Sequence, residues 1–126
     1  MSMRGDFVEL VTILKTVTAL EVVPQGSEVG DNDLFVSYLS IPGGVERAFD
    51  GGGPYLAVWQ IDVWCRKHTL APDPEEMTFS VSQQIVEHMK GLPRYSIRQM
   101  PMFTSPSEAS MGYARALLKL NGIYSL

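Results

Sequence analysis

The segment from Tyr55 to Arg66 constrains the fold most, because its hydrophobic residues alternate along its whole length. Even positions carry a mixture of apolar and polar side chains, whereas odd positions carry only apolar ones: Tyr55, Ala57, Trp59, Ile61 and Val63. Side chains of a β-strand point alternately to the two faces of a sheet. The pattern therefore predicts a long strand whose odd face lies on the core, anchored by Trp59, and whose even face is partly covered.

Segments on the N-terminal side of this strand predict the rest of one sheet edge. Leu34–Ile41 is rich in aromatic and branched residues, which favours a strand paired antiparallel with residues 55–66. Val22-Val23 predicts a short edge strand, because breakers follow it. After the interruption at Pro42-Gly43-Gly44, the segment Val45–Phe49 predicts a bent continuation of the sheet.

Two segments near the C-terminus predict a closing pair of strands. Tyr95–Phe103 alternates loosely, and Pro101 indicates an edge strand because proline donates no ladder hydrogen bond. Met111–Leu120 places four apolar residues on one face: Ala114, Ala116, Leu118 and Leu120. Its Ala, Leu, Lys and Arg content also suits a helix over Ala109–Leu120, which is the alternative. The period-two alternation favours the strand.

Apolar residues at helical spacing predict a first helix over Asp6–Leu20, with Asp6 as its N-cap and Glu9 completing a capping box. Several β-branched residues weaken its helix propensity, so packing must hold it. The apolar stripe consists of Phe7, Leu10, Val11, Leu14, Val17 and Thr18.

A second helix is predicted after Asp73, the expected N-cap, with Pro74 as its first residue. Gly91 and Pro93 end it. Its apolar face has a four-residue step and consists of Met77, Val81, Ile85 and Met89, widened by Phe79 and Val86.

These elements predict one α+β domain over residues 1–126, with a mixed, mainly antiparallel sheet of four to five strands and two helices packed on it. The chain has 126 residues, of which 45% are hydrophobic, enough for one core. Its apolar runs are too short to span a bilayer, and the N-terminus has no signal-peptide pattern. We therefore expect a soluble intracellular product without a membrane partner.

The net charge is −4, which argues against a protein that grips DNA by neutralising its phosphates. Residues 1–63 carry 9 acidic and 3 basic side chains, whereas residues 64–126 carry 5 acidic and 7 basic ones. This asymmetry suits acidic and basic faces that meet in a ring or filament. A chance distribution along a short chain is the alternative.

Segments in a fixed order along nearly the whole chain carry a resemblance: the first helix, Val22–Gly26, Leu34–Tyr38, Glu46–Gly51 and Val58–Trp64. They resemble the small tail-completion proteins of long-tailed bacteriophages, the family of the lambda-like tail terminator and related head–tail connector proteins. Val58–Trp64 is similar to that family's variable-Gln-Ile-Asp-Val-aromatic strand. The glycines of 42–44 and 51–53 exceed the family pattern, which puts the geometry of these loops in doubt.

The resemblance implies a non-enzymatic virion protein without cofactors. Such a protein assembles in the host cytoplasm as a ring, usually a hexamer, at the head-proximal end of the tail or at the head–tail junction. It would end tail-tube growth and dock the head completion proteins. DNA would pass through the bore of the ring without specific contacts.

The expected contact region is the loop that contains Arg47, Asp50, Gly51, Gly52 and Gly53, because long, adaptable loops suit assembly. Trp64, on the mixed face of its strand, is the other interface candidate. The glycine triplet also suggests a phosphate cradle, but that site needs a following helix, and here a strand follows. We expect a loop that is mobile in the monomer and ordered in the ring.

Other residue patterns are only weak evidence for a metal site or a catalytic site. Asp62, Cys65 and His68 have a metal-like spacing, but Asp62 and Cys65 point to opposite faces of one strand. Cys65 could pair with His68 or His88 as nucleophile and base, but no local motif supports such a pair. The simpler expectation is a half-buried thiol and a surface histidine.

Two acidic groups also have structural explanations. Glu75 and Glu76 suit the positive end of a helix dipole better than acid–base catalysis. Asp31-Asn32-Asp33 suits a turn, because the later ligands of a calcium loop do not follow.

The methionines of the second half are expected mostly to fill the core, with a partner surface as the alternative; they are Met77, Met89, Met100, Met102 and Met111. Two other function classes stay open. One is a small ligand-binding or enzyme-like α+β dimer with a closed apolar pocket. The other is an accessory protein that only regulates a partner.

Overall fold

The structure is a computed structural model that describes residues 3–28, 32–41, 46–47, 55–70 and 72–124. Within these ranges, two helices and six strands follow one another. In order they are α1 (Met3–Thr18), β1 (Val22–Pro24), β2 (Leu34–Ser40), β3 (Glu46–Arg47), β4 (Tyr55–Arg66), α2 (Pro74–Lys90), β5 (Tyr95–Thr104) and β6 (Tyr113–Tyr124).

The strands form one mixed sheet with the order β1-β2-β4-β6-β5. The short strand β3 pairs with the beginning of β4, so Glu46 and Arg47 continue the sheet as predicted. Among the described strands, β1 and β2 pair in parallel and the other pairs are antiparallel. The predicted α+β class, with its mixed and mainly antiparallel sheet, is confirmed.

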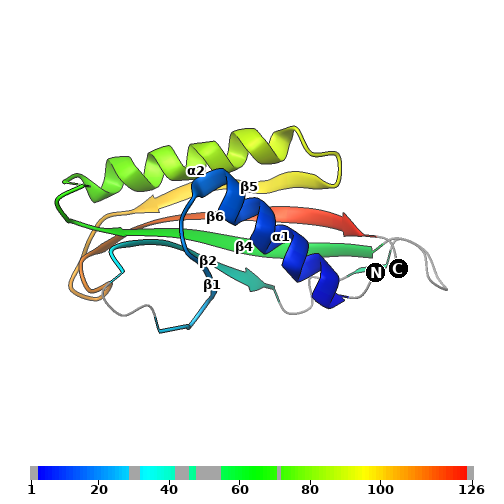
Figure 1. The fold of residues 1–126 in the computed structure, drawn as a ribbon, viewed down its shortest axis with the longest axis horizontal. Helices are drawn as coiled ribbons and strands as arrows, with labels where there is room; N and C mark the ends of the chain where they lie inside the picture. Colours follow the sequence, from blue (N-terminus) through cyan, green and yellow to red (C-terminus); the bar gives the residue numbers. More distant parts are fainter. Residues whose placement is uncertain (1–2, 29–31, 42–45, 48–54, 71, 125–126) are drawn as a thin grey trace.

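Both helices lie on the same face of the sheet (Figure 1). They bury the odd face of β4, where Ala57, Trp59, Ile61 and Val63 are fully buried. Leu10 and Leu14 of α1 and Ile85 and Met89 of α2 complete this layer of the core. The even face of β4 points to the other side of the sheet, which no helix in the described ranges covers. Period-two alternation thus decided both faces of the central strand.

Helix α1 differs from the prediction at both ends. It begins at Met3, so Asp6 lies inside the helix and is not its N-cap. It ends at Thr18, because Ala19 has a φ of 56° and leaves the helical conformation. The Thr18 hydroxyl then accepts the Leu20 N–H at 3.2 Å. A capping side chain contributes only about 1 kcal/mol, which is too little to set a helix end alone.

Helix α2 agrees with the prediction. The Asp73 carboxylate accepts the Glu76 N–H at 3.3 Å, and Pro74 is the first helical residue. Gly91 ends the helix: its N–H donates to the His88 carbonyl, and the Leu92 N–H donates to the Met89 carbonyl, each at 3.1 Å. Phe79 is the exception to the predicted apolar face, because it points to solvent and is half exposed.

The C-terminal pair of strands is also confirmed, and the helical alternative for residues 109–120 is wrong. Alternation prevailed over helix propensity because Ala114, Ala116, Leu118 and Leu120 are all fully buried on one face of β6. β5 is an edge strand, and its pairing with β6 shifts register on both sides of Gln99, near Pro101.

The turn before β6 holds Met111 in a costly conformation. Its φ is 57°, a region that disfavours residues with a Cβ, and its side chain is 75% exposed. We expect Met111→Gly to raise the free energy of unfolding by about 1 kcal/mol, because glycine removes the steric cost and little packing is lost. Thermal unfolding should show a rise in Tm of about 4 °C. Ala109→Gly, in the same turn without a positive φ, should instead lower the Tm.

Candidate interaction surface

Most of the predicted contact loop lies outside the described residues, which include neither Asp50 nor Gly51, Gly52 and Gly53. Arg47 lies in β3, with its backbone opposite Tyr55 of β4. The use of this loop in a contact, and its ordering in a ring, therefore stay predictions.

Trp64 lies on the uncovered face of the sheet inside an aromatic cluster. Its indole N–H donates to the Ser37 hydroxyl at 2.9 Å, and its ring stacks on Phe35 with centroids 6.3 Å apart. Tyr113 approaches edge-on, and the Arg115 guanidinium lies 4.8 Å from the ring centroid. The half-buried ring is thus held rigidly by its own chain, and a partner contact through its exposed part stays a prediction.

Beside this cluster, Asp62 is fully buried, and both of its carboxylate oxygens have hydrogen-bond partners. Arg115 Nε and Nη2 each lie 2.9 Å from Asp62 Oδ1, and Gln60 Nε2 donates to Oδ2 at 3.0 Å. Removing one member of a buried ion pair costs about 3–5 kcal/mol, because it leaves the other charge uncompensated. Asp62 therefore joins β4 to β6, a contact that its place on the mixed face did not reveal.

Asp62 and Cys65 cannot bind one metal ion together, because the Cys65 thiol lies on the core face of the sheet and Asp62 on the other. The thiol is fully buried, not half buried as expected. No cluster of three metal-ligating side chains occurs in the parts of the chain that are described. Burial, and secondarily the Asp33 charge, raises the pKa of the Cys65 thiol. A protonated, buried thiol is a poor nucleophile.

The two candidate bases lie in different surroundings. His68 is partly buried rather than at the surface: Nδ1 accepts the Leu70 N–H at 3.3 Å, while Nε2 is buried without a hydrogen-bond partner. His88 lies on the exposed side of α2.

The raised pKa and the burial of Cys65 predict slow reaction of its thiol in the folded chain. At pH 8 a raised pKa lowers the thiolate fraction of Cys65, and burial blocks access, so a thiol reagent should modify the folded chain far more slowly than the denatured chain. The rate in the folded chain should follow the unfolding equilibrium. Fast modification of the native protein would contradict the burial of this side chain. Val8→Cys, which exposes a thiol on α1, is the positive control.

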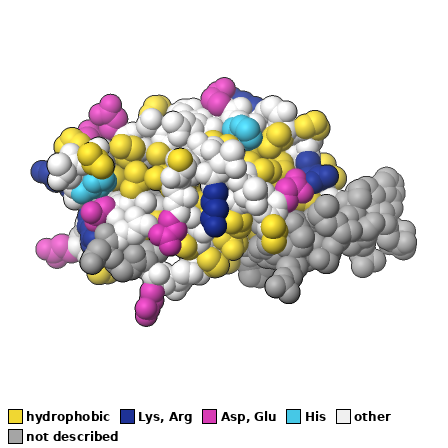
Figure 2. Space-filling model, in the orientation of Figure 1, with side chains coloured by type: hydrophobic (Ala, Val, Ile, Leu, Met, Phe, Trp, Pro, Cys, Tyr) yellow, Lys and Arg dark blue, Asp and Glu magenta, His cyan; other side chains and the backbone are white. Residues whose placement is uncertain are grey.

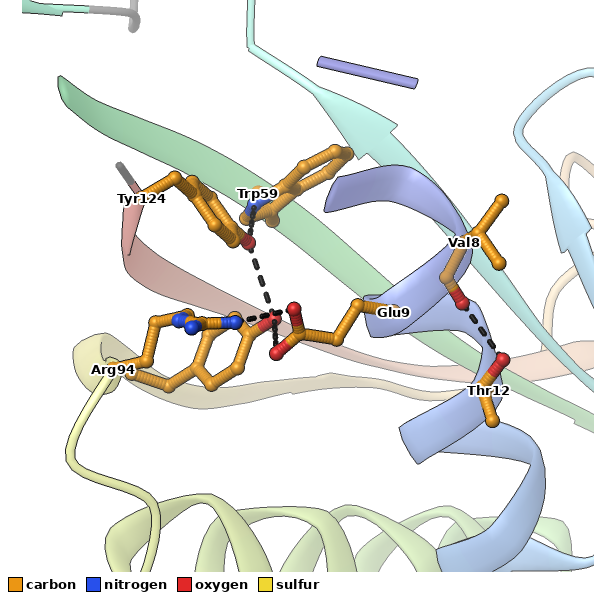
Figure 3. A network of polar contacts seen from close by, with 7 residues as sticks. Val8, Glu9, Thr12, Trp59, Arg94 and Tyr124 are labelled. Carbon is orange, nitrogen blue, oxygen red and sulfur yellow. Dashed lines mark hydrogen bonds and ion pairs between the residues drawn. The ribbon is translucent and has the colours of Figure 1, made fainter. Parts of the chain in front are cut away.

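A chain of hydrogen bonds connects the core to α1 (Figure 3). The Trp59 indole donates to the Tyr124 hydroxyl at 3.1 Å, which donates to the Tyr95 hydroxyl at 3.2 Å. Tyr95 donates to Glu9 Oε1 at 3.4 Å, and Arg94 pairs with Glu9 Oε2. An indole only donates and a carboxylate only accepts, so each hydroxyl in this chain has a set direction.

Burial raises the pKa of Tyr95, which keeps its hydroxyl protonated as a donor. The sequence had suggested a capping role for Glu9, and the structure instead pairs it with a loop 85 residues away. Because the members come from four distant segments, local sequence patterns carried no signal for this network.

Gly122 makes room for this network. A Cβ at this position would lie 2.5 Å from Tyr124 Oη and 2.7 Å from two ring carbons. We expect Gly122→Ala to displace the Tyr124 ring, break its bonds to Trp59 and Tyr95, and lower the free energy of unfolding by about 2–3 kcal/mol. Denaturant unfolding measures the loss, and near-UV circular dichroism reports the aromatic rings.

The matched control is Gly91→Ala, whose Cβ would meet only the His88 carbonyl at 3.5 Å. It should change stability by less than about 1 kcal/mol. Equal effects at the two glycines would show that Tyr124 does not depend on the missing side chain.

An open apolar groove of about 530 Å³ lies beside the network. Its walls are the side chains of Ile13, Leu92, Pro93 and Ile123, and Glu9, Arg94 and Tyr95 complete the lining. Pockets of this size accommodate small apolar ligands. The groove is the feature that bears on the ligand-binding alternative.

Exposed apolar side chains lie on both faces of the edge strand β5 and on the first half of α2, and we call this edge of the molecule the α2–β5 surface. It consists of Phe79 (49% exposed), Met100 (52%), Met102 (61%) and Phe103 (49%). The rings of Phe79 and Phe103 touch, with centroids 5.5 Å apart. Figure 2 shows hydrophobic side chains exposed on the face that carries both helices.

The methionines divide between core and surface. Met89 is fully buried and Met77 packs against the core, as expected for core filling. That expectation is wrong for Met100, Met102 and Met111, because an edge strand and a turn leave their side chains exposed. The alternation of β5 was weak in the sequence, and this irregularity was the available signal for its exposed second half.

Comparisons with protein-family models and with curated proteins find no match for this chain. None of the helices within the described ranges is long and apolar enough to cross a membrane. The case for a function therefore rests on the geometry above and on the resemblance in the sequence.

Proposed function

We propose that this chain is a structural protein of a long-tailed bacteriophage virion. It forms a ring, a hexamer as the resemblance implies, at the head-proximal end of the tail. The ring ends tail-tube growth and joins the tail to the head through the head completion proteins. DNA passes through its bore without specific binding, and the net charge of −4 is consistent with weak DNA contact.

The α2–β5 surface is the observation that carries this proposal. Four large apolar side chains exposed along one edge of a small domain are typical of a surface that contacts protein. Full burial of one such side chain contributes about 1.5–3 kcal/mol, so burying these exposed halves contributes several kcal/mol before the entropy cost of association. An assembly protein uses this energy to hold its neighbours.

The candidate reactive groups support a structural role as well. Asp62 is engaged by Arg115 and Gln60, and the Cys65 thiol is buried with a raised pKa. These side chains hold strands together or fill the core, which agrees with a protein that acts through its surfaces.

The groove beside Glu9 and Arg94 favours one second candidate, a small ligand-binding domain. This groove is open, whereas the ligand-binding alternative expects a closed pocket that buries most of its ligand. Saturable binding of a small apolar ligand, lost in Ile123→Asp, would favour this candidate over the ring.

Electron microscopy of the purified protein, together with size-exclusion chromatography and light scattering, tests the ring. We expect rings with the mass of about six chains, formed alone or on added tail tubes, and tubes that stop growing when the protein is added. Phe103→Ser should weaken the assembly, because it removes exposed apolar area without touching the core. A chain that stays monomeric alone and beside tail tubes would overturn the proposal.

A further inference from the structure

Two sides of the molecule present different grooves. The α2 side has a groove on the outer surface of α2, lined by Glu76, Phe79, Ser80, Gln83, Gln84 and Glu87. The α1 side has a groove between α1 and β2, lined by Val8, Val11, Thr12, Lys15 and Tyr38. Helix α2 packs over β5, β6 and β4, whereas Tyr38 lies on β2, near the other edge of the sheet. The two grooves therefore belong to opposite halves of the sheet.

The two grooves carry opposite charges. Glu76 and Glu87 flank the α2 groove, and Lys90 partly balances Glu87 at 3.5 Å. Lys15 is the charged residue of the α1 groove, and no described carboxylate pairs with it. In the helical layer, the α2 side is acidic and the α1 side is basic.

In the sheet layer the charges are reversed: the α2 side is basic and the α1 side is acidic. The α2 side ends in β5, whose charged residue is the exposed Arg98. The α1 side ends in β1, which the exposed Glu21 precedes and the exposed Glu28 follows. Suppose that two copies meet with helices beside helices and sheet beside sheet. A contact between the α1 side of one copy and the α2 side of the other then brings opposite charges together in both layers. The same arrangement with two α2 sides in contact instead brings the carboxylates of the two helical layers together, where they repel each other.

We propose that the α1 side of one copy packs against the α2 side of a second copy, which names the subunit contact and rests on the proposed ring. Such a contact joins two different surfaces, and its repetition closes into a ring when the rotation between copies allows it. It also covers Phe79, the part of the α2–β5 surface that lies in the α2 groove.

Helix geometry gives this contact a register. Helix α1 crosses the sheet obliquely and, along the long axis of the molecule, runs against α2, so a neighbour in the same orientation presents α1 obliquely to α2 (Figure 1). Val8 and Lys15 are seven residues apart, as are Glu76 and Gln83, a spacing of about 10 Å along a helix. Lys15 then meets Glu76 while Val8 lies over Gln83 and Gln84.

Edge features of β5 explain why such a contact does not simply extend the sheet. Pro101 lacks a donor, Arg98 is charged, and the ladder is irregular around Gln99. All three devices hinder continuous strand pairing. The contact therefore uses side chains of the helical layer, which leaves the angle between copies free to differ from that of a flat sheet.

Charge reversal tests the contact. Lys15→Glu and Glu76→Lys should each weaken self-association about three- to tenfold, measured by analytical ultracentrifugation, and the double variant should restore it. Both side chains are exposed, so thermal unfolding of the variant monomers should fall only slightly, because each reversal also removes a helix-dipole interaction of about 0.3–1 kcal/mol. Glu108→Lys makes the same charge change in an exposed turn outside both grooves, and it should leave association unchanged.

A cross-linking experiment reports the same contact even when association is weak. A mixture of Val8→Cys and Gln84→Cys chains, treated with a short bifunctional thiol reagent, should give a mixed dimer. Either variant alone should give little, because the contact joins unlike sides. Cys65 is buried and does not compete.

The outcomes separate the contact from the proposed function. Rings that persist in the charge variants, with cross-links only between like variants, would overturn the contact and leave the ring standing. If the wild-type chain forms no ring alone or on tail tubes, while the two cysteine variants still give the mixed cross-link, the proposed function is overturned and the contact stands.

Discussion

The structure depends on the burial of one face of β4 under both helices. Trp59, Ile61 and Val63 are fully buried there, and strands β2 and β6 flank β4 along most of its length. Leu10 and Leu14 attach α1 to this face, and Ile85 and Met89 attach α2. Apolar burial at about 25 cal/mol per Å² is the main favourable term in such a small domain. Helix α1, rich in β-branched residues, is stable because this packing outweighs its modest propensity.

Polar contacts then specify how these layers meet. The bonds from Trp59 through Tyr124 and Tyr95 to Glu9 link the centre of the core to α1 and to the loop after α2. On the other face of the sheet, the pair of Asp62 and Arg115 links β4 to β6 beneath Trp64. Buried polar groups are costly unless satisfied, so these contacts exclude other registers more than they add stability.

The surface left after this packing suggests how the chain works. Asp62 is paired with Arg115 and the Cys65 thiol is turned inward, while large apolar residues of α2 and β5 are turned outward. A small domain with one apolar edge, and with unlike charges arranged in complementary layers on its two sides, is suited to contacts with copies of itself. That arrangement agrees with the proposed ring.

The sequence by itself determined the elements with strong local signals. Period-two alternation defined β4 and β6 and identified Trp59 as a core residue, and Asp73 with Pro74 located the start of α2, because these signals depend on neighbours within a few residues. Only the tertiary structure decided the start of α1, the burial of Asp62 and Cys65, and the exposure of Phe79 and Met102. It also decided the role of Gly122, whose missing side chain leaves space for the Tyr124 ring. The burial of Asp62 and Cys65 arises from contacts with segments far apart in the chain, and the Gly122 contact depends on the orientation that distant Trp59 and Tyr95 give to the Tyr124 ring; no local pattern encodes such partners.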